Sequence, residues 1–341
     1  MENTLGNNIS VVIPLYNSEK ELPQLIEGLK KQTDRDFEVI LVDDNSRDNT
    51  YNVAQAIIDN DRRFKIFKNE SNLGSGYTRN YGVERALNSI ILFLDYDVIP
   101  SPNLIYETKS FFNDVSAYKA VTGISDGVSI RRSVIPQFLA LFDYYDSVYK
   151  KRKFITLFDP RVGAIKKDFF QKIGGFNTKY KGASIEDYEI SSRITQRGRI
   201  YLNKKMIVSH NFPDFKRLAF NNITRGYYWF QLFIRNFRFG NYGNATLFGA
   251  ISTFLSIPFW LFLFRTVFSL SSIFYSLFIY LIFILLYWRF LIFSVKRTHR
   301  ILFFFFYPFI IIYFFTLCGI GCFFGALGSL IIFLSRLTMI H

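Results

Sequence analysis

Residues 90–97 read IILFLDYD, and this stretch decides the fold of the N-terminal part of the chain. A short apolar run of β-forming residues is typical of a strand that is buried on both faces. Buried strands do not end in paired acids for stability, because a bare buried carboxylate is costly. Asp95 and Asp97 leave the strand on the same side and can grip one cation, and hard oxygen ligands favour Mg²⁺ or Mn²⁺. The alternative is a solvated strand end, where Asp is a common turn residue.

Strand and helix patterns alternate before this stretch. Strands are expected at Ser10–Ile13, Phe37–Val42, Phe64–Phe67 and Ile90–Leu94, and helices at Glu21–Gln32, Asp48–Asn60 and Ser75–Asn88. The alternation predicts an α/β fold with a mainly parallel sheet flanked by helices. Ligands of such sheets bind beyond the carboxyl ends of the strands. Three polar clusters follow these strands and should share one crevice: Pro14–Asn17, Asp43–Ser46 and Asp95–Asp97.

Two further features of this crevice are candidates for nucleotide binding. Asp44, or its neighbour Asp43, can accept a hydrogen bond from a base or a ribose, although both also fit an N-cap or an Asx-turn. Residues 72–80 read NLGSGYTRN and open a helix, where Gly74 allows close backbone approach and Arg79 adds a cation near the phosphate-binding N-terminus. The alternative is a loop with Ser75 as the N-cap. A dinucleotide fingerprint is absent, since Arg79 stands where its last glycine would be.

A second acidic cluster begins at Glu186 and Asp187. Acids in the first turn of a helix are favoured by the helix dipole, so ordinary capping is one interpretation. The other is a general base that takes a proton from a substrate hydroxyl. Arg193 lies two turns after Glu186 on the same helical face and is expected to pair with it.

The composition changes near residue 247, after which long apolar runs dominate and acidic residues vanish. Leu247–Phe268 and Ser272–Val295 are each long enough to cross a bilayer. Ile301–Leu334 is expected to be one tilted helix, a helix kinked at Pro308, or a re-entrant pair. We expect three membrane segments, with two or four as alternatives. Close helix packing in the last segment would be permitted by Gly319, Gly321, Gly325 and Gly328.

The formal net charge of +14 does not indicate nucleic acid, because the basic groups gather beside the apolar segments, where anionic lipid is the more economical partner. Residues 212–246 are basic and aromatic, as in a helix that lies in the membrane interface. Lys296, Arg297 and Arg300 follow the second apolar segment. The positive-inside rule then puts the N-terminal domain in the cytoplasm. Cys318 and Cys322 lie in an apolar helix and suggest no disulfide framework or zinc site.

The ordered set of motifs resembles the family 2 glycosyltransferases, which have the GT-A fold, a Rossmann-type α/β domain. The resemblance covers roughly residues 9–210 and is far more specific than any single piece. Its matching pieces are VVIPLYN at 11–17, VDDNS at 42–46, residues 72–80, LDYD at 94–97, GGF at 174–176 and ED at 186–187. It implies a catalytic domain over residues 1–211, the interfacial linker at 212–246 and a transmembrane region at 247–341.

The resemblance also implies a reaction. The family uses nucleotide-diphosphate sugars and inverts the anomeric centre. The metal, Mn²⁺ or Mg²⁺, would be held by Asp97 with help from Asp95, and some members use a histidine at the place of His210. Asp187 would be the base, supported by Glu186 and Arg193. The donor would be bound by Pro14, Tyr16, Asn17, Asp43, Asp44, Gly74, Arg79 and Asp95.

Departures from the family pattern narrow the range of possible acceptors. Gln196-Arg197-Gly198-Arg199-Ile200 lacks the tryptophan of processive polymer synthases. We therefore expect transfer of one sugar to a membrane-associated, lipid-linked glycan acceptor at a bacterial-type inner membrane, in cell-envelope polysaccharide biosynthesis. The alternatives are a polyprenyl-phosphate glycosyltransferase and an inactive membrane scaffold that binds nucleotide sugar. The sequence does not determine the sugar or the oligomeric state.

Overall fold

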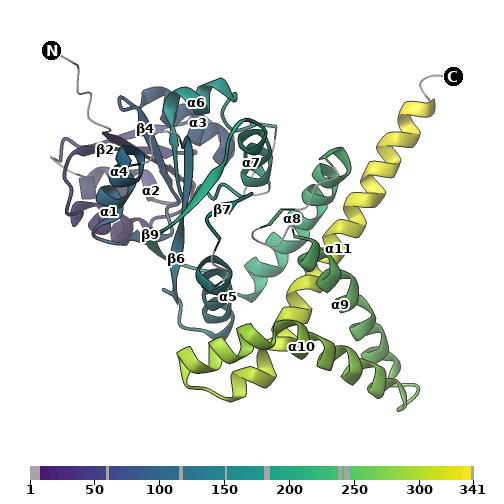
Figure 1. Cartoon of the computed structure of the whole chain (residues 1–341). Coiled ribbons are helices and arrows are strands. Elements are labelled where there is room, and N and C mark those ends of the chain that lie inside the picture. The colour runs from purple at the N-terminus through teal and green to yellow at the C-terminus, as the bar shows by residue number, and fades with distance from the viewer. Residues whose placement is uncertain are drawn as a thin grey trace. The chain divides into compact units, whose positions relative to one another are not determined.

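The computed structural model describes residues 8–58, 61–114, 118–149, 152–179, 185–236, 240–241 and 246–338. The chain divides into two units (Figure 1). The first, here called the α/β unit, consists of Met1–Arg132 and Asp146–Phe212, and the second, here called the helical unit, of Ser133–Tyr145 and Pro213–His341. Residues 133–145 thus belong with the C-terminal helices, although they lie far from them in the sequence.

The first half of the α/β unit alternates strand and helix as expected. Its elements are β1 (Ile9–Leu15), α1 (Leu22–Lys30), β2 (Phe37–Asp43), α2 (Thr50–Ile58), β3 (Phe64–Lys68), α3 (Ser75–Arg85) and β4 (Ile90–Leu94). The four strands are parallel, with β1 paired to both β2 and β4 and β3 paired to β2. Every residue of β1, β2 and β4 is buried, as we expect for short apolar runs that form the central strands of a sheet.

The second half of the unit makes the sheet mixed. Its elements are β5 (Val98–Pro100), α4 (Leu104–Asp114), β6 (Ala120–Ser129), β7 (Phe154–Ile155), β8 (Val162–Lys166), α6 (Lys167–Lys172), α7 (Glu186–Arg197) and β9 (Ile200–His210). The strand order is β3-β2-β1-β4-β8-β6-β9-β5, with β7 attached to β9. Strand β8 is antiparallel to β4 and β6, and β9 is antiparallel to β5. The predicted α/β class is confirmed, and the parallel pairing that we expected holds throughout β1–β4.

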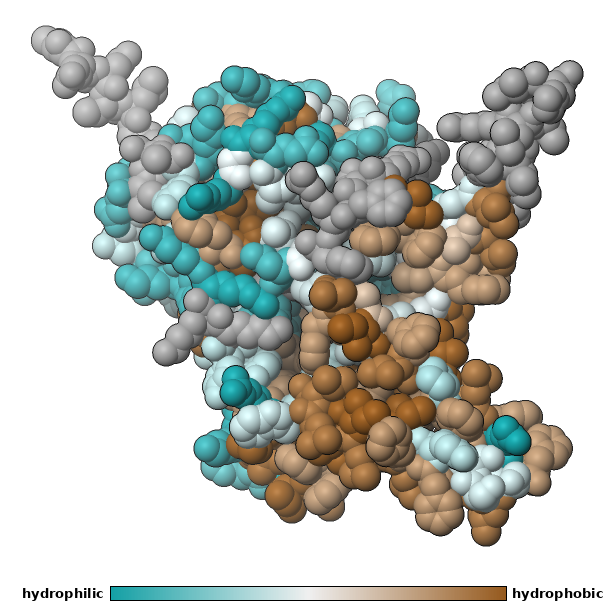
Figure 2. All heavy atoms as spheres, turned by 45° about the vertical axis from the view of Figure 1, so that its right-hand side comes forward, coloured by the Kyte–Doolittle hydropathy of each residue, from teal (hydrophilic) through white to brown (hydrophobic). Residues whose placement is uncertain are grey.

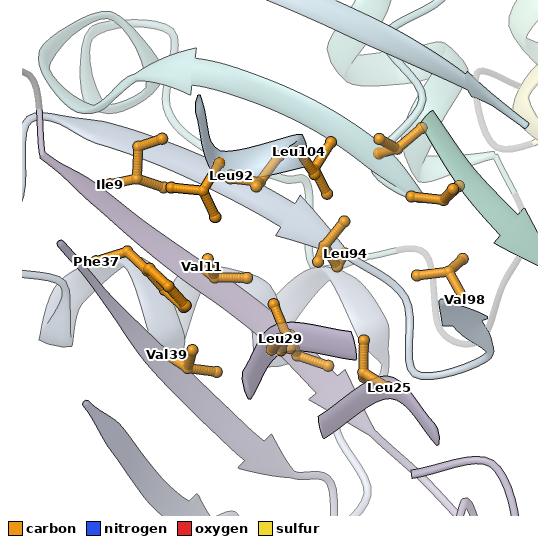
Figure 3. Close-up of a cluster of buried hydrophobic side chains, with 14 of the residues drawn as sticks. Ile9, Val11, Leu25, Leu29, Phe37, Val39, Leu92, Leu94, Val98 and Leu104 are labelled. Atoms are coloured by element: carbon orange, nitrogen blue, oxygen red, sulfur yellow. The ribbon is translucent and has the colours of Figure 1, made fainter. Parts of the chain in front are cut away.

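Hydrophobic side chains cover both faces of the sheet. On one face Val11, Val39 and Leu92 pack against Leu25 and Leu29 of α1 (Figure 3). On the other face the ring of Phe93 contacts the rings of Phe158, Phe170 and Phe176. Helix α3 lies on this second face, where Gly82 packs so closely on Val12 that an added Cβ would stand 2.5 Å from its Cγ1. The strands are therefore held rigidly between two helical layers.

A buried carboxylate ties three segments together at the end of the sheet opposite the polar clusters. Glu38 of β2 is 8% exposed and accepts hydrogen bonds from Ser10 Oγ at 2.6 Å and from the Leu87 backbone N–H at 2.6 Å. Lys65 lies 3.1 Å from its other oxygen. Burial by itself would raise the pKa of Glu38, but these hydrogen bonds and Lys65 outweigh it, and its pKa is lowered.

We predict that Glu38→Gln lowers the free energy of unfolding by about 1–3 kcal/mol at neutral pH, since it leaves buried donors poorly paired. Because the folded-state pKa lies below the ordinary 4.5, the contribution of the charge is complete above pH 4.5 and is lost as the pH falls through the folded-state pKa. Thermal unfolding of the detergent-solubilised protein at a series of pH values measures this. A difference between wild type and variant that grew on acidification would contradict it.

The helical unit contains helices long and apolar enough to span a membrane. Its elements are α5 (Val134–Tyr144), which continues as a π-helical turn over Tyr145–Tyr149, and α8 (Phe215–Asn236), α9 (Leu247–Arg265), α10 (Ser272–Thr298) and α11 (Leu302–Thr338). Within the described residues the candidate spans are three, Leu247–Arg265, Ser272–Thr298 and Leu302–Leu330. The last segment forms a single helix with Pro308 inside it, so the re-entrant pair is wrong. Figure 2 shows hydrophobic residues gathered over this unit.

Helix α5 packs on α10 and α11 through aromatic rings. Phe138 is 1% exposed and contacts the rings of Phe290 and Tyr307. Phe142 also contacts Phe290, and the Arg297 guanidinium stacks over Tyr144. The apolar face of α5 is therefore covered by the membrane-type helices.

Glycines bring α8 and α11 into backbone contact. A Cβ on Gly321 would overlap the carbonyl oxygen of Ile223, and one on Gly226 would overlap the carbonyl oxygen of Cys318. At Gly325 the added Cβ would stand 2.5 Å from the Tyr227 carbonyl oxygen. The helix that we expected to lie in the membrane interface thus packs along α11.

We predict that Gly321→Ala destabilises the protein by about 1–3 kcal/mol, because backbone atoms cannot yield to the new methyl group. Gly328→Ala is the matched control, since its added Cβ would meet the end of the Tyr227 side chain, with the hydroxyl nearest at 3.0 Å, rather than backbone atoms. Thermal unfolding in detergent compares the two variants. Equal losses of stability in the two variants would mean that the backbone contact between α8 and α11 at Gly321 leaves room for a methyl group.

Candidate active site

Strand register brings the polar clusters to one edge of the sheet. Leu15 pairs with Asp43, so the loops that follow β1 and β2 begin side by side. Leu94 pairs with Val162 across an antiparallel ladder, which places Asp95 beside the residues that precede β8. Val98 pairs with His210 in the same way, so the end of β9 lies next to Asp97. The polar clusters therefore meet at one edge of the sheet, where these strands end.

The loop after β1 is held to the loop after β2. Pro14 lies inside β1, Tyr16 is half-buried, and Asn17 has a left-handed backbone with φ of 50°. The Asn17 side chain accepts a hydrogen bond from the Arg47 N–H at 2.8 Å, and its backbone N–H donates to Ser46 Oγ at 3.0 Å. The two loops thus brace one another.

Asp43 and Asp44 are both buried and both shape loops. Asp43 accepts the hydroxyl hydrogen bond of Ser46. Asp44 Oδ1 accepts from the Asn69 side chain at 2.8 Å and from the Leu73 N–H at 2.9 Å, and Oδ2 accepts from the Gly74 N–H at 2.8 Å. Asp44 therefore fixes the start of α3, and contact of either aspartate with a nucleoside stays a prediction.

Arg79 is the buried cation of the crevice. It is 4% exposed and lies with one terminal nitrogen 2.7 Å from Asp95 Oδ1 and the other 3.3 Å from Glu186 Oε1. Ser75 Oγ donates to the same Glu186 oxygen at 2.8 Å, and Arg79 stacks over the ring of Phe176. We expected Arg79 to face a phosphate, whereas in this structure it bridges two carboxylates that are far apart in the sequence.

The environment of Asp95 disfavours its charged form. Burial raises the pKa of Asp95, and the carboxylates of Asp97 and Asp159 raise it further against the lowering effect of Arg79. The three carboxylates therefore repel one another in a buried place. Such crowding is typical of a site that binds cations.

The acid pair is placed by a turn that Asn80 of α3 holds. Gly174 and Gly175 have φ of 84° and 61°, which a side chain would strain, and Asn80 exchanges hydrogen bonds of 2.8 and 2.9 Å with the backbone of Phe176. Glu186 and Asp187 then open α7 and are both buried. The dipole of α7 favours negative charge on these first-turn carboxylates.

The expected pairing of Arg193 with Glu186 is corrected. The Arg193 side chain binds Glu189 through two of its nitrogens, and its third donates to the Ile173 carbonyl. An i,i+4 partner on the same helix lies nearer than one two turns away. Arg193 therefore supports the turn before α7, and the cation beside Glu186 is Arg79. A direct part for Arg193 in catalysis stays a prediction.

Asp97 and His210 lie side by side, and two neighbours escaped the sequence analysis. His210 Nε2 is 3.4 Å from Asp97 Oδ1, and Arg161 contacts His210 Nδ1 at 3.2 Å. Asp159 binds Arg161 at 2.7 Å. The signal that could have found them is Asp-Pro-Arg directly before the apolar strand at 162–166.

The residues fit a metal ion that enters the site together with a bound diphosphate better than an ion that the protein holds permanently. Across the described ranges no group of three or more His, Cys, Asp or Glu side chains is arranged to hold a metal. Asp95 is paired with Arg79, and Asp97 lies beside it with His210 at 3.4 Å. Mg²⁺ sites often use one or two carboxylates together with substrate phosphates and waters. Asp97 fits that pattern if a diphosphate supplies the remaining oxygens.

The fold and this edge of strand ends define an α/β domain of the nucleotide-binding type. Residues 10–174 match the family model of "Glycosyl transferase family 2". The chain carries a family 2 glycosyltransferase domain, with a GT-A-like fold.

Known proteins resemble the chain over part of their length. An uncharacterized glycosyltransferase of Haemophilus influenzae is 28% identical over 197 residues, which are 55% of this chain and 62% of that protein. The GalNAc(5)-diNAcBac-PP-undecaprenol beta-1,3-glucosyltransferase of Campylobacter jejuni is 34% identical over 90 residues, 26% and 29% of the two chains. The chain thus spans less than two thirds of these relatives.

The structure of the mannosyltransferase PcManGT from Pyrobaculum calidifontis, solved with GDP-Man and Mn²⁺, matches with a TM-score of 0.53 and 18% identity. The match covers 70% of this chain and 66% of that one, and at this identity it supports the fold alone.

We predict that Arg79→Met costs about 3 kcal/mol of stability, because it leaves the buried carboxylate of Glu186 and the partly exposed one of Asp95 without their cation. Arg85→Met on the same helix is the control, since Arg85 is half-exposed and stacks on Tyr81. Thermal unfolding in detergent compares the two. If both variants melted together near wild type, the Arg79 bridge would not be a structural element.

Proposed function

We propose that the protein is a membrane-bound, metal-assisted, inverting glycosyltransferase. It would move a sugar from a nucleotide-diphosphate sugar to a hydroxyl of a membrane-associated, lipid-linked glycan. One observation carries this proposal: Arg79 joins Asp95, at the end of β4 and within the residues 10–174 that match the family model, to Glu186, beside Asp187. In the proposed reaction Asp95 would lie on the donor side and Glu186 on the acceptor side, so the bridge would join the two sides of the site.

The donor side must bind a diphosphate and stabilise its departure. A divalent cation bound there would neutralise negative charge on the leaving diphosphate. Asp97 would hold that cation, and the braced loops at Asn17 and Asp44 would bind the nucleoside. These groups are fixed by the sheet before the donor arrives, so little reorganisation accompanies the reaction.

The acceptor side needs a base on the face of the sugar opposite the leaving group. Asp187 is the candidate, because its carboxylate begins α7 and its neighbour Glu186 is already bound by Ser75 and Arg79. Asp187 would take the proton of the acceptor hydroxyl while that oxygen attacks the anomeric carbon. One displacement of this kind inverts the configuration.

Two features support a membrane acceptor on the cytoplasmic side. The three apolar helices give membrane association, and the relative from Campylobacter jejuni is named for a diphosphate-undecaprenol acceptor. Helix α5 is continuous at both ends with the α/β unit and contacts Arg297 at the end of α10. By the positive-inside rule the basic end of α10 would lie on the cytoplasmic side, as the charge pattern of the sequence also predicts for the N-terminal domain.

The test is transfer and hydrolysis with a panel of nucleotide sugars, on membranes that contain the protein, with and without Mn²⁺ or Mg²⁺. We expect metal-dependent release of nucleotide diphosphate from one donor, abolished in Asp97→Ala. Asp187→Asn should lower turnover by about 10²–10⁴-fold while it keeps nucleotide binding. Glu84→Gln, an exposed change on α3, is the control and should leave both unchanged.

The outcomes separate the alternatives. Transfer to bare polyprenyl phosphate would replace the lipid-linked glycan as acceptor. Full turnover in Asp187→Asn would remove Asp187 as the base. Nucleotide-sugar binding without release from any donor, in membranes that supply lipid-linked acceptors, would indicate a binding protein rather than an enzyme.

A further inference from the structure

We propose that Arg161 is a positioning residue that makes His210 a hydrogen-bond donor at Nε2 rather than a metal ligand. The proposal rests on the proposed function, because the group that would accept this hydrogen bond is Asp97 or an oxygen of the donor's diphosphate. It changes the expected role of His210, which the family resemblance placed on the metal.

The argument begins with the direction of one hydrogen bond. A terminal nitrogen of Arg161 lies 3.2 Å from His210 Nδ1. A guanidinium has only donors and cannot accept a hydrogen bond. Nδ1 must therefore present its lone pair to Arg161, and the proton of the neutral imidazole stands on Nε2.

The opposite nitrogen faces the acidic edge of the site. His210 Nε2 lies 3.4 Å from Asp97 Oδ1. A protonated Nε2 is a donor and has no lone pair for a metal. A histidine that binds metal usually donates its other ring N–H to a carboxylate or a carbonyl, which fixes the tautomer that ligation needs. His210 has a cation at that place, so its tautomer is the reverse.

Neither partner can easily turn away. Arg161 is held by the Asp159 carboxylate, which also accepts the Arg161 backbone N–H at 3.0 Å. The ring of Phe212 packs at 4.3 Å from the His210 ring centroid and lies under the Arg161 guanidinium. The side chains of Arg161 and His210 are 11% and 14% exposed. A ring flip would put Cδ2 in the place of Nδ1 and Cε1 in the place of Nε2, and would lose the contacts with both Arg161 and Asp97.

The consequence concerns how the leaving group is stabilised. Asp97 would hold the divalent cation without His210, and the Nε2–H would point to an oxygen of Asp97 or of the diphosphate. Arg161 would add positive charge behind that hydrogen bond. The histidine and the metal would then act on the diphosphate from separate positions.

The direct test is nitrogen NMR of the full-length protein in detergent or bilayers with ¹⁵N-labelled histidine. The sequence contains only three histidines, so His210→Gln assigns the signal. We expect an unprotonated Nδ1 and a protonated Nε2 for His210 in wild type, and a changed ratio in Arg161→Met. Arg161→Lys, which keeps a donor, should restore the wild-type pattern. A protonated Nδ1 in wild type would overturn the proposal, and this outcome does not depend on any activity.

Nucleotide binding gives a second way to distinguish a His210 that donates a hydrogen bond from a His210 that coordinates the metal. UDP and GDP are titrated into the protein with EDTA and then with Mn²⁺. If His210 donates to the diphosphate, His210→Ala weakens metal-free binding roughly fivefold, the equivalent of one net hydrogen bond, and His210→Gln restores it. If His210 is a ligand, metal-free binding is unchanged and only the Mn²⁺-dependent part falls, by about 10–100-fold. That second result would rule out a hydrogen bond from His210 to the diphosphate, and together with an unprotonated Nε2 in the NMR spectrum it would overturn the proposal. Failure of wild type to bind either nucleotide would instead count against the proposed function, and the NMR result would still decide the tautomer.

Discussion

The site depends on one buried guanidinium. Arg79 binds Asp95 at the end of β4 and Glu186 at the start of α7, two residues that no local structure brings together. A buried ion pair adds little to stability by itself, but breaking one is costly, because the remaining charge is left in a poor solvent. The cost of separation therefore keeps the donor edge and the acid pair in one arrangement. The hydrogen bonds of Asp44 to Leu73 and Gly74 fix the N-terminus of α3, the helix that carries Arg79.

The charge balance of the crevice gives it a second property. Carboxylates outnumber cations where Asp95, Asp97 and Asp159 meet, and the pKa of Asp95 is raised by burial and by its two acidic neighbours. Burial also opposes ionisation of Asp159, yet the pKa of Asp159 is lowered, first of all by the Arg161 guanidinium beside it. Arg79 thus pairs with Asp95, and Arg161 pairs with Asp159. Such a place attracts a cation without closing a cage around it, which suits an ion carried by a substrate.

The sequence predicted what local pattern controls. The apolar runs of β1, β2 and β4 and the acids that follow them were recognised because each strand is short, buried and ended by a turn. The antiparallel strands were not recognised from the sequence. The pairing of β8 with β4 is determined by tertiary packing, and the alternation of strands and helices along the chain does not reveal it. Arg79 was found as a cation, but its partner lies 107 residues away. Arg161 and His210 are likewise 49 residues apart, and only the register of β8 and β9 brings them to Asp97.

The packing of α5 on the C-terminal helices limits how the chain can be truncated. It is inserted between β6 and β7, yet its partners are α10 and α11, and Phe138 is covered by Phe290 and Tyr307. A protein cut after Phe212 would keep α5 and lose everything that covers it. Its exposed aromatic face would then resemble the patches that cause aggregation in destabilised proteins. A soluble version of the α/β unit would therefore require α5 to be shortened or made polar, and removal of the C-terminal helices would not be enough.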